Sequence, residues 1–175
     1  WFFHNPVSSF AEGVPGLDNR PPGSSRTDSV IIGAHFDRFD STYTPALTGR
    51  WPNFRGASFD NINRENIRLI DKWPAGGPKI MWEKDLGEGH AAAAIYNGRV
   101  YLLDYDERKE RDMLHCYALT DGKELWRRGY SVKIKRNHGM SRTIPAVNDN
   151  YVVTVGPRCQ VMCCDAITGK LMWGK

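Results

Sequence analysis

DGKELW, the stretch Asp121–Trp126, returns 47 residues further along the chain as TGKLMW, Thr168–Trp173. The match extends upstream, where Ala94–Leu103 aligns with Ala146–Val155 at an offset of 52. The second copy is therefore five residues shorter in its middle. Fixed periods in this range are typical of stacked supersecondary units. This similarity indicates a repeat protein.

A third, partial copy precedes these two. The sequence KIMW ends at Trp82, which lies 44 residues before Trp126. The repeated part of the chain therefore begins near Lys79.

Turn residues divide each repeat into short strands. Asn97-Gly98 lies between two apolar runs, which is the strongest short-range hairpin signal because both central residues of a type I′ turn need positive φ. Asp121-Gly122 offers the same chemistry and Thr168-Gly169 a weaker form of it. Two hairpins in about 45 residues give one four-stranded antiparallel sheet, which is the blade of a β-propeller. We expect an all-β fold.

The tryptophan that closes each copy has a structural role in such a fold. A large ring at the end of a short strand can wedge between adjacent blades and bury about 200 Å², while its N–H reaches a backbone acceptor. The residues expected to be structural are Trp82, Trp126, Trp173, Gly98, Gly122 and Gly169.

Composition is that of an ordinary globular chain, with 41% hydrophobic and 25% charged residues. The net charge of +4 is too small to indicate nucleic-acid binding. The basic residues Lys133 and Lys135 alternate with apolar ones, as in a half-exposed strand. We therefore expect no nucleic-acid partner.

Three segments are expected along the chain. Residues 1–50 are rich in Gly, Pro and Ser and predict a tether or linker with little regular structure. We expect residues 51–78 to form a lead-in segment that packs on the propeller, and residues 79–175 to form a truncated set of blades. The aromatic start, Trp1–Phe3, fits either the tail of a hydrophobic anchor that lies outside this chain or a local aromatic cluster.

The repeat resembles that of the PQQ-like (pyrroloquinoline-quinone-type) β-propellers. The resemblance rests on the pattern Ala-x-x-(Asp/Thr)-Gly-Lys-x-x-Trp after a Val-Tyr-x-Leu strand, and on the segments Trp51–Gly56 and Trp73–Trp82. The latter resemble an exported bacterial branch that is grouped with the propeller lipoprotein of outer-membrane barrel assembly. The resemblance covers residues 51–175. It implies a propeller, commonly of eight blades, of which this chain holds about two and a partial one.

The resemblance implies two functions. The first is a non-catalytic scaffold at the cell envelope, periplasmic or membrane-anchored, which binds a protein or polymer partner beside the remaining blades of the parent chain. It needs no catalytic residue and no cofactor. The alternative is a quinoprotein, an alcohol or sugar dehydrogenase that depends on PQQ and calcium.

Adjacent cysteines could contact such a cofactor. Quinone-dependent dehydrogenases of similar fold carry a vicinal disulfide against PQQ, so the resemblance implies that Cys163, Cys164 and Arg142 bind it. The other interpretation is that both cysteines are small buried hydrophobes, since Cys116 occupies the place that matches Cys163. A disulfide that uses Cys159 is a further option in an oxidising compartment.

The densest polar cluster, residues 133–143, leads into the first strand of a repeat. In a propeller such a segment rims the central channel, where it could present donors to an anion such as a carboxylate. The alternative is a solvated loop. The candidate ligand-binding residues are His90, Arg136, His138, Ser141, Arg142 and Thr143.

No metal site is expected. His35-Phe36-Asp37 resembles part of a zinc aminopeptidase site, but the further ligands of a two-metal site do not follow it. We expect a short strand with a turn at Gly33–Asp37 instead. Acidic residues from Asp104 to Asp112 suit a solvated loop better than a calcium loop, because their spacing does not match an EF-hand.

Overall fold

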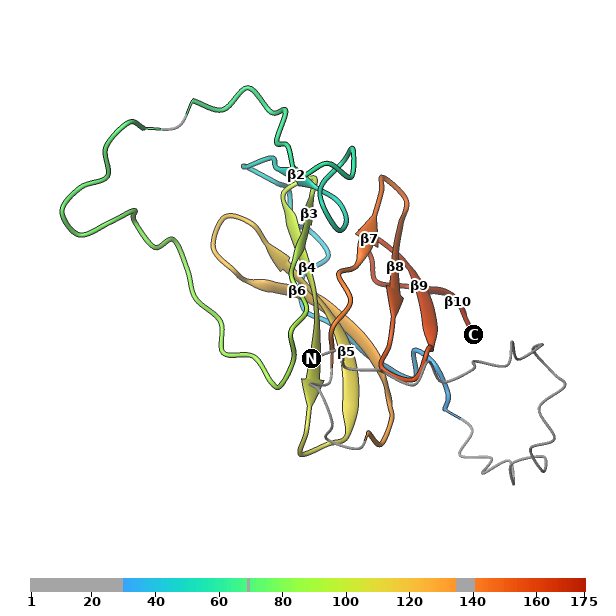
Figure 1. Ribbon diagram of the computed structural model, residues 1–175. Helices are drawn as coiled ribbons and strands as arrows, with labels where there is room; N and C mark the ends of the chain where they lie inside the picture. The colour runs from blue at the N-terminus through green and yellow to red at the C-terminus, as the bar shows by residue number, and fades with distance from the viewer. Residues whose placement is uncertain (1–29, 69, 135–140) are drawn as a thin grey trace, which may run out of the picture.

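The computed structural model describes residues 30–68, 70–134 and 141–175 (Figure 1). All regular structure in these ranges is β, and every strand pair is antiparallel. The strands are β1 (His35–Arg38), β2 (Arg50–Trp51), β3 (Ala94–Tyr96), β4 (Arg99–Asp106), β5 (Arg111–Ala118), β6 (Glu124–Ser131), β7 (Ala146–Val147), β8 (Tyr151–Val155), β9 (Val161–Asp165) and β10 (Leu171–Gly174). The expected fold class is confirmed.

The first sheet has six strands in the order β1-β6-β5-β4-β3-β2. The four consecutive strands β3 to β6 form one blade, joined by successive hairpins. β1 pairs with the outer strand β6 and β2 pairs with the inner strand β3. Both added strands come from the part of the chain around residues 35–51, which the sequence predicted to be mostly irregular. The sequence indicated a short strand with a turn at Gly33–Asp37, but not its pairing, because the partner strand lies about 90 residues away in sequence.

The second sheet has four strands in the order β10-β9-β8-β7 and forms a second blade. β8 and β9 have five residues each, whereas β4 and β5 have eight each. The shorter middle of the second repeat therefore shortens its two central strands.

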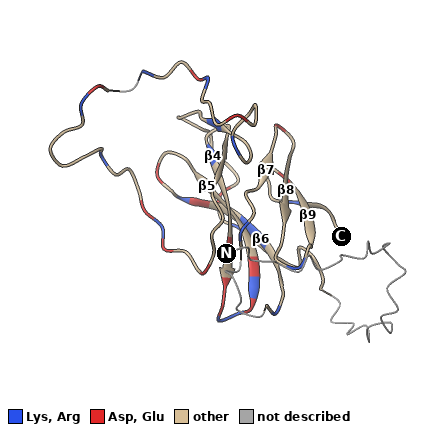
Figure 2. Cartoon of the chain, viewed as in Figure 1, with Lys and Arg blue, Asp and Glu red and all other residues tan. Residues whose placement is uncertain are grey.

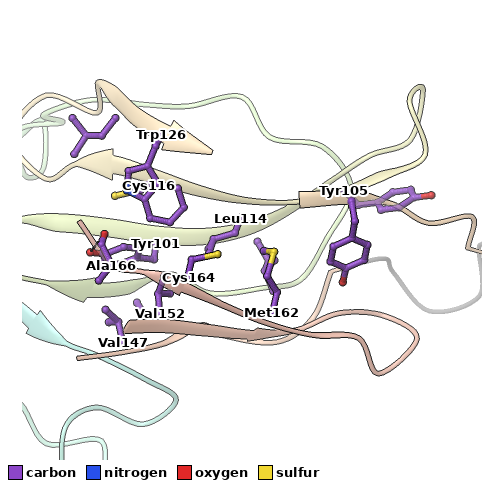
Figure 3. Close-up of a cluster of buried hydrophobic side chains, with 14 of the residues drawn as sticks. Tyr101, Tyr105, Leu114, Cys116, Trp126, Val147, Val152, Met162, Cys164 and Ala166 are labelled. Carbon is purple, nitrogen blue, oxygen red and sulfur yellow. Dashed lines mark hydrogen bonds between the residues drawn. The ribbon is translucent and has the colours of Figure 1, made fainter. Parts of the chain in front are cut away.

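The core lies between the two sheets (Figure 3). Alternate residues of β4, β5 and β6 point toward the second sheet, as the period of two in a strand dictates. The first sheet contributes Tyr101, Leu103, Leu114, Cys116 and Trp126, and the second contributes Val147, Val152, Met162, Cys164 and Ala166. The innermost strands β3 and β7 lie next to each other, as blades around a common axis require.

The third, partial repeat forms no strand. Residues 79–83 have no regular secondary structure and pair with no strand in the described chain. They belong to a long irregular arm between β2 and β3, which projects from the body in Figure 1. Of the ranges that the structure describes, none contains a helix long and apolar enough to cross a membrane.

Candidate functional site

The contact between the blades is built around Trp126. Its side chain is 0% exposed, and its ring centroid lies 6.1 Å from that of Tyr101 at a tilt of 55°. The indole packs directly on Gly169 of the second blade, where an added Cβ would come within 2.6 Å of Cδ2. The ring therefore wedges between the two blades, against the glycine of a turn.

Trp82 makes the same contact one repeat earlier. An added Cβ on Gly122 would come within 2.7 Å of its Cδ2 atom. The Trp82 Nε1–H donates a hydrogen bond of 2.9 Å to the carbonyl oxygen of Leu119. The arm thus repeats the tryptophan–glycine contact of Trp126, although it forms no strand. The Nε1–H of Trp126, in contrast, is buried without a hydrogen-bond partner in the described ranges, so the expected backbone acceptor is missing there.

Trp173, the third tryptophan of the series, is 50% exposed. It lines an open hollow of about 490 Å³ on the outer face of the second blade, together with Tyr151, Val153 and Met172. In the strand register Trp173 lies opposite Cys163, just as Trp126 lies opposite Cys116. This face is therefore the equivalent of the face that the first blade buries against the second.

Turn geometry follows the glycines. Asn97 and Gly98 both have positive φ, at 46° and 68°, as a type I′ turn requires. At the two later turns only Gly122 and Gly169 have positive φ, at 70° each. The expectation of a type I′ turn at Asp121-Gly122 is wrong. Five residues lie between β5 and β6, so a single left-handed glycine reverses the chain.

The predicted anion-binding cluster is only partly brought together. Arg136 and His138 lie outside the described residues. The chain around His90 contacts the segment of Ser141 through a backbone bridge. The backbone N–H of His90 donates a hydrogen bond of 2.7 Å to the backbone carbonyl oxygen of Ser141. Arg142 is exposed beside them.

Two hydroxyl groups of that cluster are used inside the fold. Ser141 is buried, and its Oγ–H donates a hydrogen bond of 2.6 Å to Asp112 Oδ1. Tyr130 donates to the other oxygen of this carboxylate at 3.0 Å. Thr143 Oγ1–H donates to the carbonyl oxygen of Val155 at 2.5 Å. Asp112 is therefore a buried strand residue rather than part of a solvated loop, and burial raises the pKa of its carboxyl group.

The four cysteines are free thiols in the structure. Cys164 lies in the core between the blades, whereas Cys163 lines the hollow on the opposite face of the same strand. Neighbouring strand residues point to opposite faces, so the side chains of Cys163 and Cys164 lie on different faces of β9. Burial raises the pKa of Cys164 to about 12 and that of Cys116 still further, which keeps both thiols protonated.

Sequence reasoning missed a polar pocket on the other face of the first sheet. This cavity of about 410 Å³ is lined by alternate residues of β4 and β5, among them Asp104, Arg111 and His115. Figure 2 shows charged residues of both signs on the strands of this sheet and few on β7–β9. The available signal was the alternation of Arg111, Met113 and His115 along one strand face. No set of three or more His, Cys, Asp or Glu side chains within the described ranges is arranged to hold a metal ion.

One comparison with known proteins gives a match. The family model described as "Outer membrane protein assembly factor BamB" matches residues 110–175, which include β5 to β10. No curated protein matches the chain. The repeat, the tryptophan wedges and this match lead to one conclusion. The strands form blades of a PQQ-like β-propeller, and residues 110–175 carry the repeat of that family.

Proposed function

We propose that this chain is part of a non-catalytic PQQ-like propeller scaffold that binds a partner protein at the cell envelope. The matching family is described as an outer membrane protein assembly factor, which supports both the compartment and the class of partner. Fold alone does not determine function, so the proposal depends on the surfaces of this chain.

The observation that carries the proposal is the open face around Trp173. The same face of the first blade is covered by the second blade, with Trp126 seated on a turn glycine. We propose that a further PQQ-like repeat covers the Trp173 face and seats a glycine of its own turn on the indole. Contacts of this kind stack one blade on the next, as a propeller scaffold requires.

The cysteine geometry weighs against the dehydrogenase alternative. Cys163 and Cys164 do not fit a joint contact with PQQ, because their side chains lie on opposite faces of β9.

A titration of the full chain with PQQ and calcium tests the non-catalytic part of the proposal. We expect no saturable change in tryptophan fluorescence and no oxidation of alcohols or sugars. Saturable binding together with alcohol oxidation would overturn it.

The partner is tested separately with a labelled, unfolded outer-membrane β-barrel polypeptide as the probe. We expect saturable binding by fluorescence anisotropy, at a level that a labelled soluble polypeptide of similar length does not reach. Equal anisotropy changes for the two polypeptides would remove the support for an assembly partner.

A further inference from the structure

The polar pocket of the first sheet is crossed by one row of residues. Asp104 on β4 lies opposite Met113 on β5, Met113 lies opposite Gly129 on β6, and Gly129 lies opposite His35 on β1. All these positions face away from the second blade. The row therefore runs from a carboxylate, across an apolar floor, to an imidazole.

The β4 end of the row is acidic. Asp104 Oδ2 lies 3.9 Å from Nε2 of His115, whose Nδ1 is 2.5 Å from Glu124 Oε1. Burial raises the pKa of Asp104, while the His115 imidazole opposes that shift. This carboxylate has no ion pair with Lys or Arg within the described ranges, so it can accept a hydrogen bond from a ligand ammonium group.

Donors lie on the other three strands of the pocket. Arg111 on β5 is in register with Ser131 of β6, the residue that His35 contacts, and burial together with the Arg111 charge lowers the pKa of His35. Arg111 Nε is buried and has no hydrogen-bond partner in the described ranges. Arg127 also lines the pocket, with its Nε held 2.8 Å from Asp37 Oδ2. His35 Nε2 lies 2.9 Å from Ser131 Oγ, which fixes the orientation of the ring. A buried guanidinium N–H without an acceptor calls for an anionic group.

The floor between the two ends is apolar. Met113 is 7% exposed, and Gly129 beside it has no side chain. An added Cβ on Gly129 would come within 2.5 Å of Met113 Sδ, so the thioether lies over the glycine. Such a floor suits the methylene and amide planes of a ligand that spans the row.

The length of the row sets the size of the ligand. Three strand spacings separate the backbones of Asp104 and His35, which is about 14 Å, and side chains that stand perpendicular to the sheet keep this spacing. Two hydrogen bonds of about 2.9 Å leave roughly 8 Å between the charged groups of a ligand. An extended peptide covers about 3.5 Å per residue, so two residues fit and one is too short.

We propose that this pocket binds a short peptide with free ends, its ammonium group against Asp104 and its carboxylate against Arg111 and His35. A simple anion is disfavoured by Asp104, and a simple cation is disfavoured by Arg111 and Arg127. The pocket volume of about 410 Å³ leaves room for small side chains.

Isothermal titration of the full chain with glycylglycine tests this inference. We expect saturable binding, no binding of glycine at the same concentrations, and at least about tenfold weaker binding of N-acetylglycylglycine and glycylglycinamide, since each lacks one charged end. Equal binding of the acetylated and free dipeptides, or no heat of binding for glycylglycine, would overturn the proposal.

Variants locate the site. Asp104→Asn and Arg111→Gln should each weaken glycylglycine binding at least about tenfold. Arg68→Gln, on the irregular arm, is the matched control and should leave binding unchanged. Should either pocket variant fail to fold, the comparison of dipeptide analogues on the unmodified chain still decides. A loss of binding in Arg68→Gln equal to that in Arg111→Gln would contradict the assigned site.

Discussion

At the scale of single residues, the tryptophan and glycine pairs explain the repeated hexapeptide. Trp126 and Gly169 are 43 positions apart, and Trp82 and Gly122 are 40 positions apart. Each pair joins one repeat to the next. The glycine is needed twice over, because its φ is positive and because the indole occupies the space of a Cβ. One residue thus serves the turn and the interface together.

Gly169→Ala should destabilise the chain by about 2 kcal/mol or more. Alanine would have to adopt the positive φ of Gly169, which is strained for a residue with a Cβ atom, and its methyl group would overlap the Trp126 ring. Urea unfolding followed by tryptophan fluorescence measures the change. Gly76→Ala is the matched control, since nothing lies within 4 Å of its Cβ position, and it should shift the free energy of unfolding by less than about 0.5 kcal/mol. Equal effects of the two substitutions would contradict the wedge.

At the scale of elements, hydroxyl groups around one buried carboxylate link three parts of the chain. Asp112 lies near the start of β5, Tyr130 lies on β6, and Ser141 lies on the segment that leads into β7. No cation neutralises this carboxylate within the described ranges, and burial holds its pKa above the usual value. The stability of these contacts between Asp112, Tyr130 and Ser141 should therefore depend on the protonation state of the Asp112 carboxyl group.

Asp112→Asn should make the free energy of unfolding less dependent on pH. Because the pKa of Asp112 is raised in the folded state, its contribution is fully present below the unfolded value of about 4 and is lost as the pH rises through the folded pKa. The free energy of unfolding of the unmodified chain, measured from pH 4 to 7, should fall relative to that of the variant. The same slope in both chains would show that Asp112 does not titrate in this window.

Strand pairing shows the limit of local patterns. The β3–β4, β5–β6 and β9–β10 hairpins follow from turns that contain Gly98, Gly122 and Gly169, and could be predicted. The β4–β5 and β7–β8 turns, residues 107–110 and 148–150, contain no glycine. The pairing of β1 with β6 could not be predicted, because four residues from His35 to Arg38 carry no strong signal of their own. β1 is held by its partner strand, by the ion pair of Asp37 with Arg127, and by Phe36, whose ring lies 3.9 Å from the Arg128 guanidinium carbon.

At the scale of the whole molecule, the two blades leave unequal outer faces. The first sheet ends in a charged pocket, and the second ends in an apolar face with Trp173 half exposed. Strand edges and an open apolar face favour self-association of such a chain.

The isolated chain should therefore self-associate, and Trp173→Lys should weaken that association at least about tenfold. Burial of the exposed half of an indole, about 100 Å², contributes about 2.5 kcal/mol, which the substitution removes. Sedimentation velocity over a concentration series measures the effect. Trp73→Lys is the matched control, because Trp73 is 58% exposed on the arm. A chain that stays monomeric at high concentration would contradict the prediction.

The sequence by itself determined the blades of this protein, because turn glycines, strand alternation and closing tryptophans act through neighbouring residues and repeat with the chain. Only the tertiary structure decided which faces these residues serve. It separated Cys163 from Cys164 across a strand, buried Ser141 and Asp112, and joined His35 to Asp104 across one pocket. These outcomes depend on pairing between strands that are distant in sequence. The free energy that stabilises such pairing comes from packing and desolvation, which a local sequence pattern does not predict.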